Sequence, residues 1–378
     1  MVEKEKISVA VVGLGFGAEF VPIYLEHPNV ESVMICDSDA ERLNTVSEKF
    51  NIKEKYTEFS DIINSGEIDA VHLVSGIPDH AEQTLDVLNS GKHCACAVPM
   101  ATSIEDIWSI VNLQKETGLN YMMMETAVYT RPFLFSKDLK DKGEFGRIQF
   151  LRGAHYQDME GWPAYWLGLP PMWYATHAIS PLLEIAETRA TMVHCYGSGK
   201  MRDELIHQYG NPYPLETAIF ELDSPNLSAE VTRSLFYCAR PYMESFTVYG
   251  ENACYEWQME NESPVLFRMS PVVPGEHRTE ILERPEPLDR TELLPQSIRK
   301  YTKRFVYDSV EKHLSFEQGG GHHGSHPHLV NEFVSSIIEG RQPWIDAVTS
   351  ATWTAAGICA HKSAMMNGTE IMVPKFDD

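Results

Sequence analysis

The chain has 378 residues, of which 43% are hydrophobic and 22% are charged, and this composition excludes a disordered chain, a collagen and a coiled coil. Lysine and arginine total 31 against 54 aspartates and glutamates, so the formal net charge is −23, which argues against nucleic acid and anionic membranes as partners. At ~150 residues per domain, the length predicts two or three domains.

The sequence gives no sign of export or of membrane insertion. No run approaches the roughly 18 apolar residues that a membrane helix needs, and the N-terminus resembles no secretion signal. The seven cysteines are scattered and form no CxxC pair. We therefore expect reduced thiols in a cytoplasmic protein.

Strand and helix signals alternate over about the first 125 residues. Continuous apolar runs predict strands at 7–12, 30–36, 69–75, 93–98 and 121–124. Amphipathic segments predict a helix from the glycine-rich turn to about residue 27, then helices at 40–50, 79–90 and 103–117. This alternation predicts an α/β unit with a doubly wound parallel sheet.

The pattern changes after residue 125. Longer strands with alternating polarity are expected from about residue 147 onward, at 215–221 and near 190–197, 227–236, 244–249 and 253–259, which indicates an open, mostly antiparallel sheet. A loop and then a helix are expected over 162–185, an excursion over 270–300 and a flexible stretch at 319–321. The last helices are expected from a cap at Ser325 to about 339, and over 348–366.

The strongest motif is the run Gly13-Leu14-Gly15-Phe16-Gly17-Ala18, which fits GxGxx(G/A) directly after the first predicted strand. Such glycines permit a tight turn and let the backbone approach a pyrophosphate, although a βα turn without nucleotide is the alternative. Asp37, at the end of the second strand, is placed to accept hydrogen bonds from a ribose. Its carboxylate favours NAD over NADP, with Arg42 as the counterargument. The predicted NAD site comprises Gly13, Gly15, Phe16, Gly17, Ala18, Asp37, Ser75, His80 and Pro99.

Taken together, the motifs resemble those of the glucose-fructose oxidoreductase, inositol dehydrogenase and MocA family. The resemblance is carried by 11–17, 68–71 with Asp79-His80, 91–93, 143–148 and 331–333. It implies an N-terminal Rossmann domain for NAD and a C-terminal α+β domain for the substrate and for oligomerisation. We place these domains at residues 1–125 and 126–378 and expect a homodimer or homotetramer.

Two departures from the family pattern affect the chemistry. The family usually has Glu-Lys-Pro after its fifth strand, whereas this chain has Ala97-Val98-Pro99 and lacks the lysine. The family often has acids around a histidine in a later helix. Of that set only His177 remains, since Trp173 and Ser180 stand where the acids would be.

His177 and Tyr174 are the predicted catalytic residues. Oxidising an alcohol needs a base for the hydroxyl proton, and an imidazole with a pKa near ~6.5 suits that role. Tyr174 precedes His177 by three residues, so on a helix the two would share a face. The stretch also looks like the Tyr-Pro-Thr-His segment of NAD-using α-N-acetylgalactosaminidases. The alternatives are a buried structural histidine and ordinary aromatic packing.

An aromatic cluster and a histidine-rich segment are the candidate substrate contacts. Sugar rings present apolar faces that stack on aromatic side chains. Four histidines lie close together in the sequence, at 322, 323, 326 and 328. They could belong to a loop that contacts a polar substrate or to a solvated loop. A metal site is the third alternative, but it is the weakest of the three, and we predict no metal. The predicted substrate contacts are Tyr156, Trp162, Trp166, Trp173, His322 and His323.

The sequence thus predicts an NAD-dependent oxidoreductase that transfers hydride between a sugar or polyol derivative and the nicotinamide, with His177 as acid/base. Two alternatives stay open. One is a redox-neutral glycosidase or lyase that oxidises its sugar transiently, and the other is a catalytically silent NAD-binding protein.

Overall fold

The computed structural model describes residues 5–240, 242–259, 262–303, 305–306, 317–318 and 321–377. The chain divides into two compact units. The first comprises Met1–Thr130 and Asp289–Ala351, and the second comprises Arg131–Leu288 and Thr352–Asp378. The predicted boundary after residue 125 assigns 289–351 to the later domain, whereas the structure groups this segment with the first unit.

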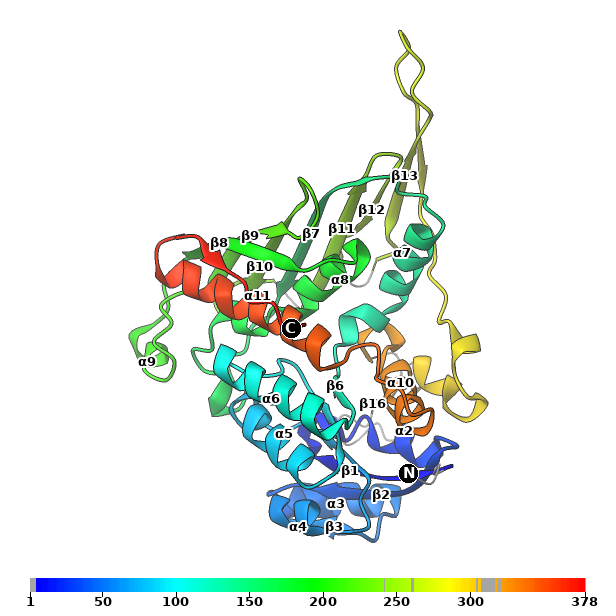
Figure 1. The fold of residues 1–378 in the computed structure, drawn as a ribbon, viewed down its shortest axis with the longest axis vertical. Coiled ribbons are helices and arrows are strands. Elements are labelled where there is room, and N and C mark those ends of the chain that lie inside the picture. Colours follow the sequence, from blue (N-terminus) through cyan, green and yellow to red (C-terminus); the bar gives the residue numbers. More distant parts are fainter. Residues whose placement is uncertain are drawn as a thin grey trace. The chain divides into compact units, whose positions relative to one another are not determined.

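The first unit contains the predicted parallel, doubly wound sheet, which is confirmed with the strand order β3-β2-β1-β4-β5-β6 (Figure 1). The order reverses between β1 and β4, and ligands of such sheets bind at the carboxyl ends of the strands flanking this point. Its strands are β1 (Ile7–Val12), β2 (Val30–Cys36), β3 (Lys55–Tyr56), β4 (Ala70–Leu73), β5 (His93–Cys96) and β6 (Tyr121–Met123).

Two helices of the first unit, α3 and α6, begin at residues whose side chains cap their first amides. Asp39 accepts hydrogen bonds at the start of α3, and Ser103 accepts one at the start of α6. Ser325 stands at the start of α10, but its side chain makes no capping hydrogen bond. The helices are α1 (Leu14–Gly17), α2 (Val21–Glu26), α3 (Ala40–Phe50), α4 (Phe59–Asn64), α5 (His80–Asn89), α6 (Ile104–Thr117) and α10 (His326–Ile338).

The single helix predicted between the glycine turn and residue 27 is wrong, because α1 is one short turn and α2 starts anew at Val21. Pro22 lies in the first turn of α2, where its missing amide proton costs nothing. The 3-10 helix η6 (Gln296–Thr302) then packs on α2, with the buried Tyr301 hydroxyl donating to Pro22 O at 3.2 Å. This contact is one reason why the later segment belongs to the first unit.

The second unit contains a nine-stranded sheet with the order β14-β13-β12-β11-β7-β10-β9-β8-β17. It is mostly antiparallel, as predicted, but β7 and β10 pair in parallel at its centre. The chain leaves β7 through α8, forms β8 and β9, and returns with β10 beside β7. Its strands are β7 (Ile148–Tyr156), β8 (Ala190–Ser198), β9 (Leu215–Leu222), β10 (Ser228–Ser234), β11 (Met243–Gly250), β12 (Ala253–Trp257), β13 (Val265–Met269), β14 (Glu280–Glu283) and β17 (Ile371–Met372).

Helix α8 (Thr176–Ala186) covers one face of this sheet over β7, β10 and β11. Gly153 allows a close approach, because a Cβ there would lie 2.3 Å from Ala178 O. The remaining elements of the unit are α7 (Arg131–Asp141), η3 (Ala164–Trp166), η4 (Pro171–Tyr174) and α9 (Asp203–Ile206), while α11 (Ala347–Met365) runs from one unit into the other.

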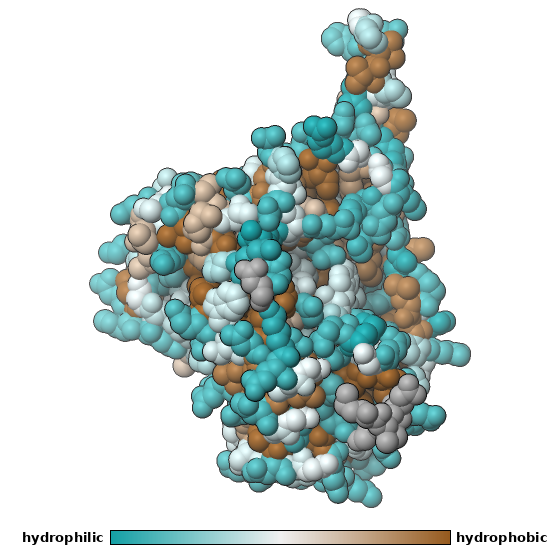
Figure 2. Space-filling view, in the orientation of Figure 1, coloured by the Kyte–Doolittle hydropathy of each residue, from teal (hydrophilic) through white to brown (hydrophobic). Residues whose placement is uncertain are grey.

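The segment predicted as an excursion over 270–300 contains β14, which pairs with β13 in a projecting arm (Figure 1). Figure 2 shows apolar side chains near the tip of this arm, where Val272 is 73% exposed. Of the predicted flexible stretch, residues 319 and 320 lie outside the described residues, and Gly321 begins η8 (Gly321–Gly324). None of the helices in the described part of the chain has the length and apolarity needed to cross a membrane.

The last short elements of the first unit are η1 (Ile77–Asp79), η2 (Thr126–Tyr129), η5 (Thr291–Leu293), β15 (Phe305–Val306) and β16 (Glu317–Gln318).

Candidate active site

The glycine-rich turn after β1 has an open side. Gly13 has φ +85°, and a Cβ on it would lie 2.4 Å from Val74 O, so only glycine fits where β1 meets the end of β4. A Cβ on Gly17 would lie 3.2 Å from Val11. Gly15, by contrast, is exposed, and a Cβ there would meet nothing within 4 Å. The turn therefore leaves room for a ligand over Gly15, which is the room a pyrophosphate needs.

Asp37 follows β2, as predicted, and in the structure it lies against this turn. Its carboxylate accepts hydrogen bonds from Leu14 N at 2.7 Å and from Asp39 N at 2.8 Å. Arg42 lies 3.2 Å from the same carboxylate. Arg42, which would favour the 2′-phosphate of NADP, is thus paired with Asp37, whose carboxylate would repel that phosphate.

His80 joins the loop after β4 to the loop after β5. One imidazole nitrogen lies 2.7 Å from Pro99 O and the other lies 3.2 Å from Ser75 O. Burial by itself lowers the pKa of His80, but Cys96 and the two carbonyls outweigh it and raise the pKa to about 9. The three predicted cofactor residues Ser75, His80 and Pro99 therefore form one connected group, in which His80 is 1% exposed and fixes the loops.

His322 and His323 belong to the first unit, and His322 lies beside the glycine turn. The His322 ring lies edge-on to Phe16 with centroids 5.8 Å apart, and its Nδ1 lies 3.0 Å from His326 Nε2. His326 Nδ1 lies 3.2 Å from Glu19. His328 contacts Asp289 O instead, so the four histidines do not converge on one point.

The second unit contains a row of buried polar side chains across four neighbouring strands. Register places Glu216 of β9 opposite Arg233 of β10, Arg233 beside His155 of β7, and His155 opposite Glu244 of β11. Each is at most 2% exposed. Burying charged groups is costly unless they compensate one another, so a row of this kind points to a function beyond packing.

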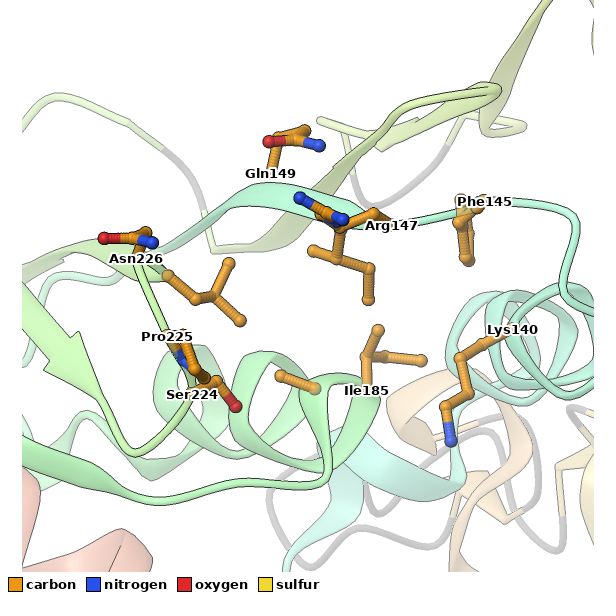
Figure 3. A pocket seen from close by; sticks show the side chains of 12 residues that line it. Lys140, Phe145, Arg147, Gln149, Ile185, Ser224, Pro225 and Asn226 are labelled. Atoms are coloured by element: carbon orange, nitrogen blue, oxygen red, sulfur yellow. The ribbon is translucent and has the colours of Figure 1, made fainter.

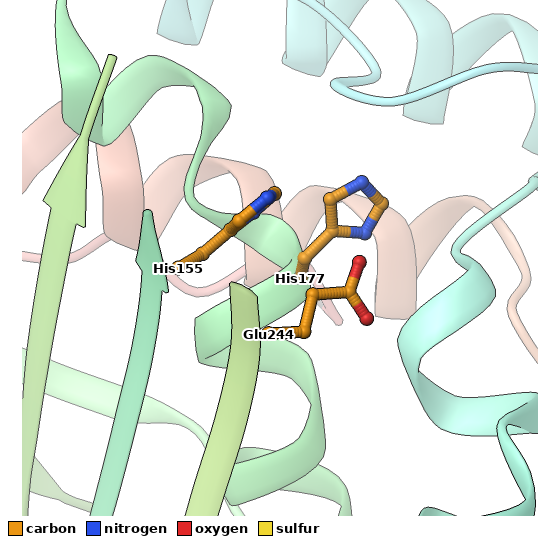
Figure 4. Close-up of side chains that lie close together, drawn as sticks. All are labelled: His155, His177 and Glu244. Atoms are coloured by element: carbon orange, nitrogen blue, oxygen red, sulfur yellow. The ribbon is translucent and has the colours of Figure 1, made fainter. Parts of the chain in front are cut away.

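His177 lies in the first turn of α8, the helix that covers this face. Figure 4 shows the imidazoles of His155 and His177 and the Glu244 carboxylate pointing toward one another. One potential ligand atom from each lies within 4.8 Å of the other two. Among the described residues this is the only such group of three histidine, cysteine or acidic side chains.

Tyr174 and the aromatic cluster surround His177. Tyr174 closes η4 and does not share a helix with His177, but their rings still meet edge to face at 5.5 Å. Trp166 packs on Tyr174 at 4.7 Å and Trp162 on Trp166 at 6.2 Å. The predicted residues thus form a continuous aromatic wall that ends at the imidazole of His177.

Two buried charges hold this wall in place. Arg233 Nε donates to Tyr174 O at 2.7 Å, and Nη1 donates to His155 O at 3.1 Å. Glu216 accepts from Met172 N at 2.9 Å and lies 2.7 Å from His361. Burial lowers the pKa of Arg233 to about 10, so its guanidinium stays charged at neutral pH.

The other two predicted substrate contacts lie apart from this wall. Trp173 packs edge-on against His361 at 5.7 Å and against Tyr209 at 6.0 Å. Tyr156 follows His155 on β7, so its side chain leaves the opposite face of the sheet.

Sequence reasoning missed His155, Arg233 and Glu244. In each strand, every second side chain faces the core, and each of these residues occupies such a position. Apolar residues fill the other core-facing positions, for example Leu151 in the strand of His155 and Val231 in the strand of Arg233. A polar residue at a position where the alternating pattern of a strand calls for an apolar one is the signal by which they could have been identified.

A cavity of about 620 Å³ lies elsewhere in the second unit (Figure 3). Its lining includes Ile148 at the start of β7 and Ile185 near the end of α8, together with Lys140 and Arg147. His155 and His177 lie at the opposite ends of the same two elements. The cavity is therefore separate from the histidine site.

Comparison with known proteins gives one family and several relatives. Residues 7–125 match the Gfo/Idh/MocA group, described as an oxidoreductase family with an NAD-binding Rossmann fold. A glycosyl hydrolase family 109 protein from Bacteroides thetaiotaomicron is 26% identical over 200 residues, which are 48% of this chain and 43% of that protein. An α-N-acetylgalactosaminidase from Shewanella oneidensis is 26% identical over 201 residues, 47% of this chain and 44% of that protein. The matches thus span less than half of these relatives.

A solved structure covers the whole fold. Levoglucosan dehydrogenase in complex with NADH and levoglucosan superposes with a TM-score of 0.77 at 16% identity, covering 98% of this chain and 100% of that one. The likeness extends across both units and concerns the fold.

Proposed function

Because this chain belongs to the Gfo/Idh/MocA oxidoreductase family through its NAD-binding Rossmann domain, we propose that it transfers hydride between a sugar or polyol derivative and NAD. NAD supplies the hydride acceptor or donor. The turn over Gly15 would hold its pyrophosphate, and Asp37 would hold its adenosine ribose.

The single observation that carries the proposal is the buried polar group around His177, at the end of an aromatic wall. Sugars need apolar faces to stack on and polar groups for their hydroxyls. The wall of Trp162, Trp166 and Tyr174 offers the first, and His155, His177 and Glu244 offer the second. The structure of levoglucosan dehydrogenase with bound levoglucosan supports a carbohydrate substrate for this fold.

We propose that His177 controls the loss of the hydroxyl proton, with the Tyr174 hydroxyl beside it as a second proton-carrying group. Val98, after β5, carries neither charge nor proton and takes no part in this step. Arg233 holds Tyr174 O and His155 O, so it positions the site and does not react.

A redox-neutral glycosidase is the second candidate, because two relatives are named as a glycosyl hydrolase family 109 protein and an α-N-acetylgalactosaminidase. In that reaction the sugar carbon would be oxidised, the glycosidic substituent eliminated and the product reduced again. The same residues would carry out the proton transfers, and NAD would be regenerated in every turnover.

A substrate screen tests the proposal. The purified protein is incubated with NAD and a panel of sugars, polyols and aryl glycosides, and both NADH absorbance and release of the aryl group are followed. Net NADH formation that is lost in His177→Ala supports hydride transfer. Release of the aryl group without net NADH, dependent on bound NAD, assigns the glycosidase instead. Unchanged turnover by His177→Ala would remove His177 from the mechanism.

A further inference from the structure

We propose that His155, His177 and Glu244 bind one divalent transition-metal ion. The proposal names a metal site in the second unit that the predicted function does not require. It concerns the same side chains as the proposed function and rests on it only for the ion's chemical role.

The geometry of the three side chains is close to that of a ligand set. Their potential ligand atoms lie within 4.8 Å of one another, so a central point lies at most about 2.8 Å from each, against about 2.0–2.2 Å in zinc sites. An inward shift of about 0.7 Å per side chain would close the site.

The backbone fixes where these side chains meet. His155 and Glu244 are register partners on β7 and β11, and α8 brings His177 over them. Gly153 lets α8 sit directly on β7, because a Cβ there would lie 2.3 Å from Ala178 O, next to His177. The three ligands thus come from three packed elements, as in a preformed site.

Charge in the buried row favours a cation. With histidines counted as neutral, Glu216 and Glu244 contribute two negative charges and Arg233 contributes one positive charge, all nearly inaccessible to water. Arg233 already interacts electrostatically with Glu244, but one arginine does not balance the two carboxylates, and a divalent ion beside Glu244 would add the positive charge that this row can accommodate.

The donor set indicates which metal. Two imidazoles and one carboxylate suit zinc, iron or cobalt rather than magnesium or calcium, and three protein ligands leave positions open for a substrate oxygen. The groups that orient such ligands are also present. The Tyr242 hydroxyl donates to Glu244 Oε1, and Arg233 Nη1 holds the backbone of His155 at 3.1 Å.

The ion would define how His177 acts. A nitrogen that binds a metal does not accept a proton at the same time, so His177 would serve as a ligand rather than as the base. The ion would supply Lewis acidity that lowers the pKa of the substrate hydroxyl, whose proton would pass to solvent, while the hydride with its electron pair would go to the nicotinamide.

The test uses the full-length protein after removal of metals with a chelator and dialysis. Titration calorimetry with Zn²⁺ is expected to give one site per chain, and Co²⁺ is expected to give the visible absorption of a four- or five-coordinate ion. His155→Ala and Glu244→Gln are expected to weaken Zn²⁺ binding by at least about 100-fold, and Tyr242→Phe by about tenfold. His207→Ala, an exposed histidine of the same unit, is the matched control and is expected to bind as the wild type does.

The outcomes separate the two proposals. The metal site is overturned if the wild type binds no Zn²⁺ at micromolar concentrations, or if folded Glu244→Gln and Tyr242→Phe both bind like the wild type. In that case, NADH formation that persists in the chelated protein would leave the proposed function standing, with His177 as the base. If Zn²⁺ binds but no carbohydrate is converted, the metal site stands and the proposed function fails.

Discussion

Arg233 orders more of the second unit than any other single side chain described above. Its guanidinium donates to the backbone of Tyr174, His155 and Ser234 and to the side chain of Gln157, at 2.6–3.1 Å. It also lies 5.3 Å from the centre of the Tyr174 ring. A planar group with five donors suits this arrangement, and the flexible ammonium of lysine does not.

Replacing this arginine should therefore destabilise the protein strongly. Arg233→Met is expected to lower the free energy of unfolding by about 3–5 kcal/mol, because it leaves the buried carbonyls and Glu244 without their cation. Urea denaturation followed by fluorescence measures the change. Arg152→Met removes an exposed arginine of β7 whose partner is Glu230, and it is expected to cost at most about 1 kcal/mol. Equal costs for the two variants would contradict this account.

Asp37 allows a second prediction at the scale of one residue. Asp37→Ala removes the predicted ribose acceptor and also frees Arg42, which lies 3.2 Å from the Asp37 carboxylate. NAD binding should weaken by about 10- to 100-fold, while NADP should lose less or gain, because the freed guanidinium favours a 2′-phosphate. Calorimetry with both nucleotides measures the two affinities. Glu41→Ala, on the same helix, is the control, and equal affinity of the wild type for NAD and NADP would refute the ribose argument.

At the scale of elements, the contact between α8 and β7 decides whether the histidines meet. Helix and strand touch through Gly153 and Ala178 O, and His155 and His177 lie just beyond that contact on each element. Any side chain at residue 153 must push the helix away from the sheet. The separation of the two imidazoles, whose centroids lie 5.2 Å apart, therefore depends on a residue that takes no part in chemistry.

Gly153→Ala is expected to lower both stability and activity. The added methyl would overlap Ala178 O, and such overpacking costs about 1–3 kcal/mol. Turnover should fall further than stability alone explains, because the helix that carries His177 moves. Thermal unfolding and kinetics at saturating NAD measure the two effects. Gly66→Ala, where a Cβ meets nothing within 4 Å, is the control; a neutral result for Gly153→Ala would disprove the close contact.

The local sequence predicts elements better than it predicts their pairing. The strands β1 and β2 and the helix α3 match their predicted bounds, because apolar runs and caps such as Asp39 act within a few residues. The parallel pairing of β7 with β10 depends on how the chain between them, about 70 residues long, brings β10 back beside β7. No local sequence pattern encodes this. The same holds for the site: the sequence predicts Tyr174 and His177 from a short motif, but His155 and Glu244 meet only through sheet register.

At the scale of the whole molecule, His80 links stability to pH. Its pKa is raised to about 9 from the ordinary value near 6.5, so folding retains a proton that the unfolded chain releases earlier. This contribution is complete below pH 6.5 and disappears as the pH rises through 9. It also connects the loops after β4 and β5, and hence the edge of the sheet where the cofactor is expected.

The expected consequence is a fall in stability of up to about 3 kcal/mol between pH 6.5 and 9.5. Denaturation curves at a series of pH values measure it, and His80→Gln should flatten the pH dependence in this range. If the wild type and His80→Gln lose stability in parallel, the protonated imidazole is not the cause.

The division of the chain into units has a consequence for protein synthesis. The backbone passes between the units three times, after residues 130, 288 and 351. When the first six strands have left the ribosome, the helix α10 and Tyr301, which complete that unit, are still untranslated. The Rossmann sheet must therefore wait, with α2 not yet covered by η6, while the nine-stranded sheet is synthesised. Folding of the first unit is thus completed almost as late as folding of the second.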